Sequence, residues 1–468
     1  MAEPAETGKL AIAMPGRNNT GVEGNQRFAT TVRNLLLYGV LLHLFAFSAI
    51  DLFSSPTESE LVADASSDAG NLYNQLVVPA AFFTVCFLVY AHRVPRRALW
   101  AVMIPTAPML LLIALSTLWS EYPELTIRRA FHEIIEVTTL ALLATCFSSA
   151  TDVLKIFFRA FLVMGCLDLL AGALFSESIT SIGFAGIHGH KNLAGEFFLV
   201  AMPVFLLGAL HREISGNRLI GLVALLSCMA MLILSESKTS MGAVPLGFAA
   251  MLVTRGLTNR DVAARVPWLL VCALGLLVAM IALAIWPFDE LLEVLVGDPT
   301  LTGRDGIWQY AISKFAASPI VGVGYGAIWQ IGPTIQSALR DMGIWMVFNE
   351  AHNGYLEIVA QLGVAGIICL LIFLTTTLRN AVSCWNTVEN RALFGVGALT
   401  IYIFWGLVLS NITESLYFAA GLGYPGMLMF LAPLAASRLA TRRRAGSRRE
   451  LSGVGARQPA HLAYRSLH

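Results

Sequence analysis

Uninterrupted apolar segments of about 20 residues recur along this chain, and they restrict its fold more than any other feature. Hydrophobic residues make up 56% of the 468 residues and charged residues only 13%, whereas a soluble domain carries about 25% charged residues. A helix of about 20 residues crosses the roughly 30 Å hydrocarbon core of a bilayer. The runs are continuous and do not alternate, which excludes a β-barrel pattern. The sequence therefore predicts an all-α, polytopic membrane protein.

We expect twelve transmembrane helices, and the spacing of the apolar runs divides the chain into five parts. These are an N-terminal tail (1–33), spans one to nine (34–286), a large loop (287–352), spans ten to twelve (353–437) and a basic tail (438–468). The first 33 residues are polar and show no cleavable signal pattern. The seven cysteines lie in or beside apolar runs, so we expect them to act as small buried hydrophobic residues. The predicted spans are 34–53, 76–92, 99–118, 132–147, 153–175, 193–210, 219–235, 240–254, 267–286, 353–378, 394–411 and 420–437.

The distribution of positive charge predicts which way the chain crosses the membrane. Lys and Arg accumulate in cytoplasmic loops. With the N-terminus inside, 23 of the 31 basic residues are cytoplasmic, Arg159 lies within a span, and seven are on the outer face. Both termini are then cytoplasmic, and the basic tail can contact anionic lipid headgroups. Because positive charge is disfavoured outside, the seven outer cations are candidate ligands for an anion: Arg128, Arg129, Lys191, Lys238, Arg304, Lys314 and Arg340.

The outer loop 287–352 is far longer than most connections, and its pattern predicts a small helical cap on the membrane surface. Thr302 and Asp305 resemble a capping box, and apolar residues then recur at helical spacing up to Pro319. The glycines of GVGYG predict a turn and lack the setting of a dinucleotide loop. A second amphipathic stretch follows at 335–342.

The segment LTGRDGIW places Arg304 in the first turn of the helix predicted after Thr302. Free backbone N–H groups there and a guanidinium suit a phosphate. The alternative is a surface arginine on an amphipathic helix.

The segment AHNGYLEIVAQLG places His352 where the tenth span begins. A histidine there could act as a general base near neutral pH, or could simply anchor the helix at the interface. Asn353, Glu357 and Gln361 repeat every four residues and form a polar stripe, which in lipid normally faces a cavity or a partner helix. We expect Glu357 and Gln361 to hydrogen-bond across helices.

Three further motifs place cations at the outer ends of predicted spans. GIHGHKN contains His188, His190 and Lys191; Lys191 suits an anion, and the two histidines alone do not make a metal site. SESKTS presents Lys238 on a tight hairpin, where it could equally attract lipid phosphate. Arg128 and Arg129 are adjacent on a helix and point about 100° apart, so we expect at most one of them to face a shared site.

Together these motifs resemble the bacterial O-antigen ligase and polymerase superfamily, and most of all its exopolysaccharide-polymerisation branch. The resemblance covers about 117–411 and is most specific over 302–366. It is carried by H-K-N, S-x-S-K-T-S, T-G-R-x-x-I-W, P-x-x-G-x-G-Y-G and H-N-x-Y-L-E.

The resemblance implies a GT-C-like, metal-independent, inverting glycosyltransferase of the bacterial inner membrane that needs no cofactor. It implies an undecaprenyl-pyrophosphate-linked oligosaccharide as donor and a glycan as acceptor at a periplasmic site, with chain-length regulators or export proteins as further partners and no nucleic acid. His352 then matches the residue that activates the acceptor hydroxyl, and Arg304 matches one that contacts the pyrophosphate. The remaining candidate substrate-binding residues are Lys191, Lys238, Arg128, Arg129, His190, Asn353, Tyr355 and Glu357.

Three alternatives remain open at the level of sequence. Some polymerases of the superfamily carry Arg followed by ten residues and Gly in outer loops. Here the eleventh residue after each of Arg128, Arg304 and Arg340, where that glycine would stand, is Thr139, Phe315 or Ala351, respectively. A ligase that transfers glycan to a lipid A core or another acceptor is therefore an alternative to a polymerase. A transporter of lipid-linked sugars, or a structural partner of an export machine, is also compatible with the apolar pattern.

Overall fold

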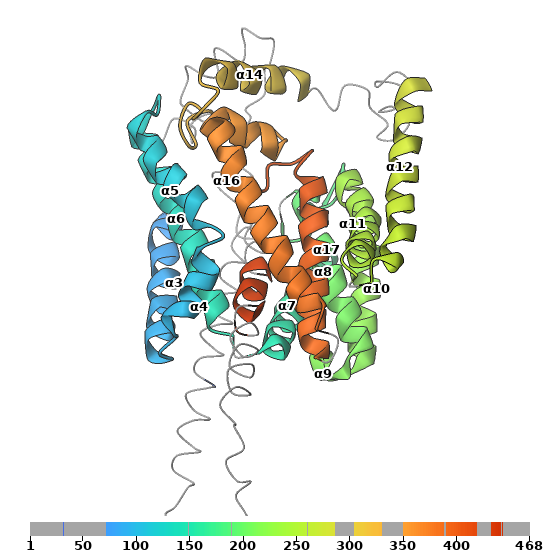
Figure 1. Cartoon of the computed structure of the whole chain (residues 1–468). Coiled ribbons are helices and arrows are strands. Elements are labelled where there is room, and N and C mark those ends of the chain that lie inside the picture. The colour runs from blue at the N-terminus through green and yellow to red at the C-terminus, as the bar shows by residue number, and fades with distance from the viewer. Residues whose placement is uncertain are drawn as a thin grey trace, which may run out of the picture.

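The computed structural model describes residues 72–147, 149–188, 190–259, 261–285, 304–329, 350–387, 390–418 and 432–440, together with the isolated residues Thr31 and Arg442. Most of these residues are helical, and the longer helices stand side by side in a bundle (Figure 1). Helices satisfy their own backbone hydrogen bonds, as a segment in lipid must. The first predicted span, both tails and most of the twelfth span lie outside the described residues.

The helices follow one another with short connections. Within the described residues, the chain also forms three 3-10 turns, Ser116–Leu118, Ser176–Ser178 and Ala263–Arg265, and a small antiparallel pair of strands, β1 (Ile179–Thr180) and β2 (Gly183–Phe184). The helices of this part of the chain are α3 (Leu72–Ala91), α4 (Arg96–Met103), α5 (Ala107–Leu115), α6 (Pro123–Thr145), α7 (Ala150–Leu174), α8 (Lys191–Leu210), α9 (Arg212–Ser215), α10 (Arg218–Leu234), α11 (Lys238–Leu257), α12 (Val266–Ile285), α14 (Arg304–Ala317), α16 (Gly354–Trp385) and α17 (Arg391–Ser410).

Within the described residues, four helices are individually long and apolar enough to cross a membrane, namely α8, α11, α16 and α17. Helices α4 and α5 together would make a fifth span, but they meet at 65°. The predicted span 99–118 is thus divided between two helices. Pro105 and Pro108 explain the break, because proline lacks the N–H that continues a helix. The total of twelve spans stays a prediction.

Helices α8 and α17 lie in the interior of the bundle. Helix α8 packs against α10 and α11, and α17 packs against α16 and α11. Phe157, Phe161 and Phe197 stack between α7 and α8 and are almost completely buried. In contrast, Phe83 of α3 and Leu270 of α12 are more than half exposed. Large apolar side chains on the outer surface of a helical bundle are what lipid tails require.

Helix α16 is broken at Gly363, whose backbone has φ 63° and ψ −160°. The amides that follow the break donate to the segment after α14: Val364 N–H to Pro319 O at 2.9 Å, and Ala365 N–H to Ile320 O at 3.0 Å. A positive φ favours glycine, and a Cβ at Gly363 would lie 2.4 Å from the carbonyl carbon of Ile320. The position therefore requires glycine for two independent reasons.

The GVGYG segment occupies the other side of the same break. Val323 N–H donates to Ala360 O at 3.2 Å, and Gly324 N–H donates to Gln361 O at 3.0 Å. The Gln361 side chain accepts from Gly326 N–H at 2.7 Å. The prediction of a turn is confirmed, and the turn satisfies backbone groups that the break in α16 leaves without helical partners.

Helix α14 lies across one end of the bundle, over the beginning of α16 (Figure 1). Its existence confirms the first predicted helix of the large loop. Thr302 and the second amphipathic stretch, 335–342, lie outside the described residues. We call the end covered by α14 the α14 end; α9 lies at the opposite end.

Candidate functional site

His352 immediately precedes the N-cap of α16 and adopts a left-handed backbone with φ 47°, which is uncommon for a residue with a side chain. The next residue, Asn353, caps the helix by accepting from Tyr355 N–H and Leu356 N–H. Gly354 N–H donates to the carbonyls of Asn411 and Glu414, beyond the end of α17. The start of α16 is thus fixed against the segment that follows α17. Strained backbone of this kind persists where surrounding contacts hold it, often at functional sites.

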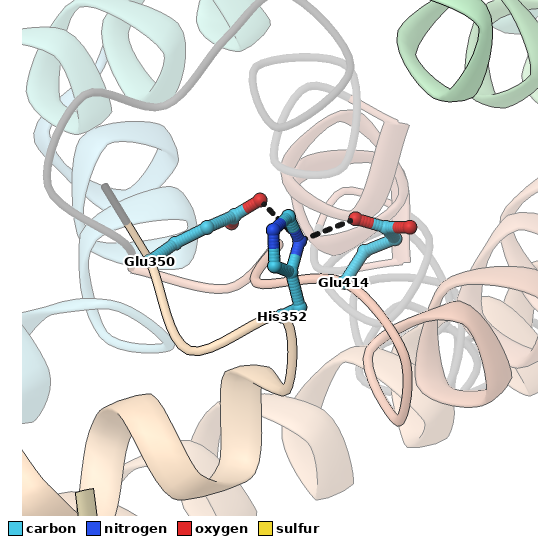
Figure 2. Close-up of side chains that lie close together, drawn as sticks. All are labelled: Glu350, His352 and Glu414. Carbon is cyan, nitrogen blue, oxygen red and sulfur yellow. Dashed lines mark hydrogen bonds and ion pairs between the residues drawn. The ribbon is translucent and has the colours of Figure 1, made fainter. Parts of the chain in front are cut away.

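Two glutamates converge on one nitrogen of the His352 ring. Nδ1 lies 3.0 Å from Glu350 Oε1 and 3.3 Å from Glu414 Oε2 (Figure 2). Glu350 comes from the same segment as His352, whereas Glu414 lies 62 residues further along the chain. The side chains of His352 and Glu350 are 29% and 32% exposed, while that of Glu414 is only 7% exposed. The cluster therefore opens to solvent on the Glu350 side and is closed on the Glu414 side.

The other carboxylate oxygen of Glu414 contacts two further predicted motifs. Asn192 Nδ2 donates to Oε1 at 2.8 Å, and the guanidinium of Arg304 lies 3.6 Å from the same oxygen. Arg304 also donates to Thr413 O at 2.6 Å. The structure thus brings the two predicted catalytic residues, His352 and Arg304, to one carboxylate.

The carboxylates determine the charge state of His352. Burial acts to lower the pKa of the imidazole, but its hydrogen bonds to Glu350 and Glu414 and their negative charges outweigh burial and raise the pKa to about 9. Glu350 acts from two residues away in the sequence, whereas Glu414 reaches the ring only through the fold. When His352 is protonated, the cluster sets two acidic side chains against two basic ones, so its formal charges balance.

Glu350, His352 and Glu414 also place potential ligand atoms within 4.8 Å of one another, as a metal site would require. Arg304, however, pairs with Glu414 on the side away from His352, and a guanidinium beside a ligand carboxylate opposes a divalent cation. Both carboxylates face the same protonatable nitrogen. The arrangement fits a charged hydrogen-bond cluster better than a metal site.

The motif around Lys191 reaches the cluster through Asn192. Lys191 donates from Nζ to Ile182 O in the strand turn at 3.0 Å, and His190 accepts from Asn192 N–H at the start of α8. His188 is buried and pairs with Asp168 at 3.3 Å, which ties the motif to α7. His188 and His190 thus have separate structural partners.

The SESKTS hairpin approaches the cluster through Thr239, whose hydroxyl lies 3.1 Å from that of Thr413. Lys238 itself is exposed at the start of α11. Of the adjacent arginines, Arg129 donates to the carbonyls of Gly326 and Trp329 in the turn after α14, and Arg128 is exposed. Arg129 thus supports the turn directly. Arg340 lies outside the described residues.

The remaining predicted residues of α16 contact neighbouring segments. Tyr355 donates from its hydroxyl to Val408 O in α17 at 2.8 Å. Glu357 is buried and accepts from Trp329 Nε1 and from Ala351 N–H, each at 2.7 Å. Gln361 also donates to Glu357. Glu357 thus holds the segment before His352 to the turn after α14; these partners lie in connecting segments, whereas the sequence led us to expect bonds to other helices.

Sequence reasoning missed Glu414. Its only signal is the polar run Ser410–Ser415 at the end of the eleventh predicted span. Such a run is ordinary in a loop between spans, and only the fold reveals that three distant segments converge on one carboxylate.

Fold and site together define a helical membrane protein with a charged His–Glu–Arg cluster at one end of its bundle. Residues 221–371 match the family described as O-antigen ligase. The chain is also 26% identical over 299 residues to the "Exopolysaccharide production protein ExoQ" of Rhizobium meliloti (strain 1021), covering 60% of this chain and 66% of that protein. The chain thus spans slightly less than two thirds of the length of this relative. The resemblance inferred from the motifs is confirmed as a similarity: part of this helical membrane protein resembles the O-antigen ligase family and an exopolysaccharide production protein.

Proposed function

We propose that this protein is a glycosyltransferase that extends a glycan carried on a polyprenyl diphosphate, with undecaprenyl pyrophosphate as the carrier, at the periplasmic face of the inner membrane. The observation that carries the proposal is the meeting of His352 and Arg304 on Glu414 at the α14 end. A base can take the proton of an attacking hydroxyl, and a cation beside it can stabilise the departing diphosphate.

In the proposed reaction, neutral His352 takes the proton of an acceptor sugar hydroxyl. With Nδ1–H donated to the glutamates, Nε2 receives that proton. The hydroxyl oxygen then bonds to the anomeric carbon as the bond from that carbon to the diphosphate oxygen breaks. The electron pair leaves with the diphosphate, whose growing charge Arg304 stabilises. A single displacement inverts the anomeric centre.

The proposed substrate contacts follow from position. Arg304 meets the diphosphate, with Lys191, Lys238 and Arg128 supplying further positive charge at the α14 end. His190, Asn353, Tyr355 and Glu357 border or support the cluster around His352. The lipid carrier enters between helices, and chain-length regulators or export proteins would bind elsewhere on the bundle.

The similarity to an exopolysaccharide production protein favours a polymerase, in which the acceptor is another lipid-linked repeat. The family match described as O-antigen ligase favours the second candidate, transfer to a lipid A core or another acceptor. Deleting the gene and separating the cell's glycans on a gel distinguishes the two. Loss of long chains with accumulation of single repeats indicates a polymerase, whereas polymer left on its carrier indicates a ligase.

Reconstitution tests the proposal itself. Purified protein in vesicles receives a lipid-linked oligosaccharide on the side of the α14 end. We expect longer glycans with the natural chain and none with His352→Ala or Arg304→Ala, both variants remaining folded and inserted. Transfer of intact donor across the bilayer without glycan growth would instead identify a transporter. Normal glycan synthesis by His352→Ala at normal protein levels would remove the base assignment.

A further inference from the structure

Glu414 belongs to none of the motifs that predicted the site, yet it contacts three of them. Its side chain is 7% exposed. Oε1 accepts from Asn192 at 2.8 Å and lies 3.6 Å from Arg304 Nη2. Oε2 lies 3.3 Å from Nδ1 of His352. One carboxylate thus joins the beginnings of α8, α14 and α16.

The backbone that carries Glu414 is fixed from several directions. Glu414 N–H donates to Ser410 O at the end of α17, and Glu414 O accepts from Gly354 N–H at the start of α16. The side chain of Asn411 accepts from Leu416 N–H and Tyr417 N–H, which closes the loop on itself. A carboxylate on so constrained a loop holds its partners at set positions.

Glu350 cannot take the same role, although it also meets Nδ1 of His352. It is two residues from His352 on the same segment and 32% exposed, so it moves with the histidine. Glu414 instead relates His352 to groups on different helices. Burying a carboxylate costs desolvation free energy, which only charged or hydrogen-bonding partners offset. The two carboxylate oxygens of Glu414 have three such partners, namely Asn192, Arg304 and His352.

We propose that Glu414 is the positioning residue of this site, orienting the proton-accepting imidazole through one carboxylate oxygen and the diphosphate-binding guanidinium through the other. This inference rests on the proposed glycosyl transfer. The carboxylate keeps the proton of His352 on Nδ1, so that Nε2 faces the acceptor, and sets the distance between the groups that act on acceptor and leaving group.

The experiment compares the pH dependence of kcat/KM for four full-length proteins in vesicles: the natural chain, Glu414→Gln, Glu414→Asp and Glu213→Gln. Glu213 is an exposed acid of α9 at the opposite end of the bundle, so its variant controls for loss of one carboxylate. Thermal midpoints in detergent measure folding separately.

Glutamine keeps the shape of the side chain but removes its charge. For Glu414→Gln we expect the rising limb of the profile to move to lower pH by about 1 unit or more, as for loss of a close opposite charge. We expect the plateau at high pH to fall at least about tenfold, because the imidazole and the guanidinium of Arg304 are no longer held in place by one carboxylate.

Aspartate keeps the charge but is one methylene shorter. For Glu414→Asp we expect the limb to move less than for Glu414→Gln while the plateau still falls, since the shorter side chain cannot reach both His352 and Arg304. Glu213→Gln should match the natural chain in both respects.

Two results overturn the inference while leaving the proposed function intact. One is a pH profile of kcat/KM for Glu414→Gln whose rising limb and plateau equal those of the natural chain. The other is a fall in activity that follows the amount of folded protein with no movement of the limb, which indicates a structural role only. Active His352→Ala and Arg304→Ala variants would instead overturn the proposed function.

Discussion

At the scale of single residues, the cluster combines two acidic side chains, Glu350 and Glu414, with two basic ones, His352 and Arg304. His352 sits between two carboxylates, and Arg304 offsets the more buried one. The two carboxylates favour the charged form of His352 and raise its pKa. The local sequence EAHNGYLE supplies the histidine, its helix cap and one of the two carboxylates, Glu350, but not Glu414.

The first residue-scale prediction concerns pH. A general base must be neutral, and the pKa of His352 is about 9, so only about 1% of the imidazole is neutral at pH 7. We therefore expect kcat/KM for glycan transfer to rise with pH from 7 to about 9 and then level off. A profile already flat between pH 6 and 8 would contradict the assignment of His352 as the base in this charge environment.

The second residue-scale prediction concerns metal ions. Because Arg304 pairs with Glu414, we expect transfer in vesicles to be unchanged after treatment with EDTA and after addition of Mg²⁺, Mn²⁺ or Ca²⁺. The lipid-linked donor is held at saturating concentration so that effects on its diphosphate are minimised. Loss of activity on chelation, with recovery on adding one cation, would show that Glu350, His352 and Glu414 hold that ion instead.

At the scale of elements, the break in α16 and the turn after α14 form one unit. Each supplies the backbone partners that the other lacks, and Glu357, Gln361 and Arg129 add side-chain bonds around the same contact. Through Ala351, this unit fixes the approach of the chain to His352.

The element-scale prediction uses glycines. Gly322 has φ 69°, and a Cβ there would lie 2.2 Å from the carbonyl carbon of Gln361. Gly322→Ala should therefore destabilise the protein by about 1–3 kcal/mol, as strained positions of this kind do, and lower both the thermal midpoint and the transfer rate. Gly242→Ala in α11 is the matched control, because its Cβ would meet nothing within 4 Å. Equal thermal midpoints for Gly322→Ala and Gly242→Ala would show that the break in α16 and the turn after α14 do not form one structural unit.

How much the sequence reveals also depends on scale. Hydropathy located α8, α11, α16 and α17 within a few residues, since a span must be apolar throughout its length. It failed at α4 and α5, where Pro105 and Pro108 divide an apolar run, and it began α6 nine residues late because the first turns of that helix are polar. The motifs identified His352 and Arg304. Glu414 could not be found, because its role comes from contacts between residues up to 222 positions apart.

At the scale of the whole molecule, every proposal depends on which side of the membrane the α14 end faces. The starts of α8, α11, α14 and α16 meet the end of α17 there. The charge distribution predicts that this end is periplasmic, because the segments at the opposite end carry most of the described Lys and Arg.

Cysteine labelling tests that orientation. In a variant with the seven natural cysteines replaced, Glu121→Cys introduces a thiol near α14, where Glu121 pairs with Lys314. Asn217→Cys introduces one between α9 and α10. We expect a membrane-impermeant maleimide added to intact spheroplasts to label the first and not the second, and to label both after permeabilisation. The reverse pattern would put the His352 cluster in the cytoplasm, where an outer-leaflet lipid-linked glycan could not reach it, and a periplasmic transfer reaction would then be excluded whatever the activity of the point variants.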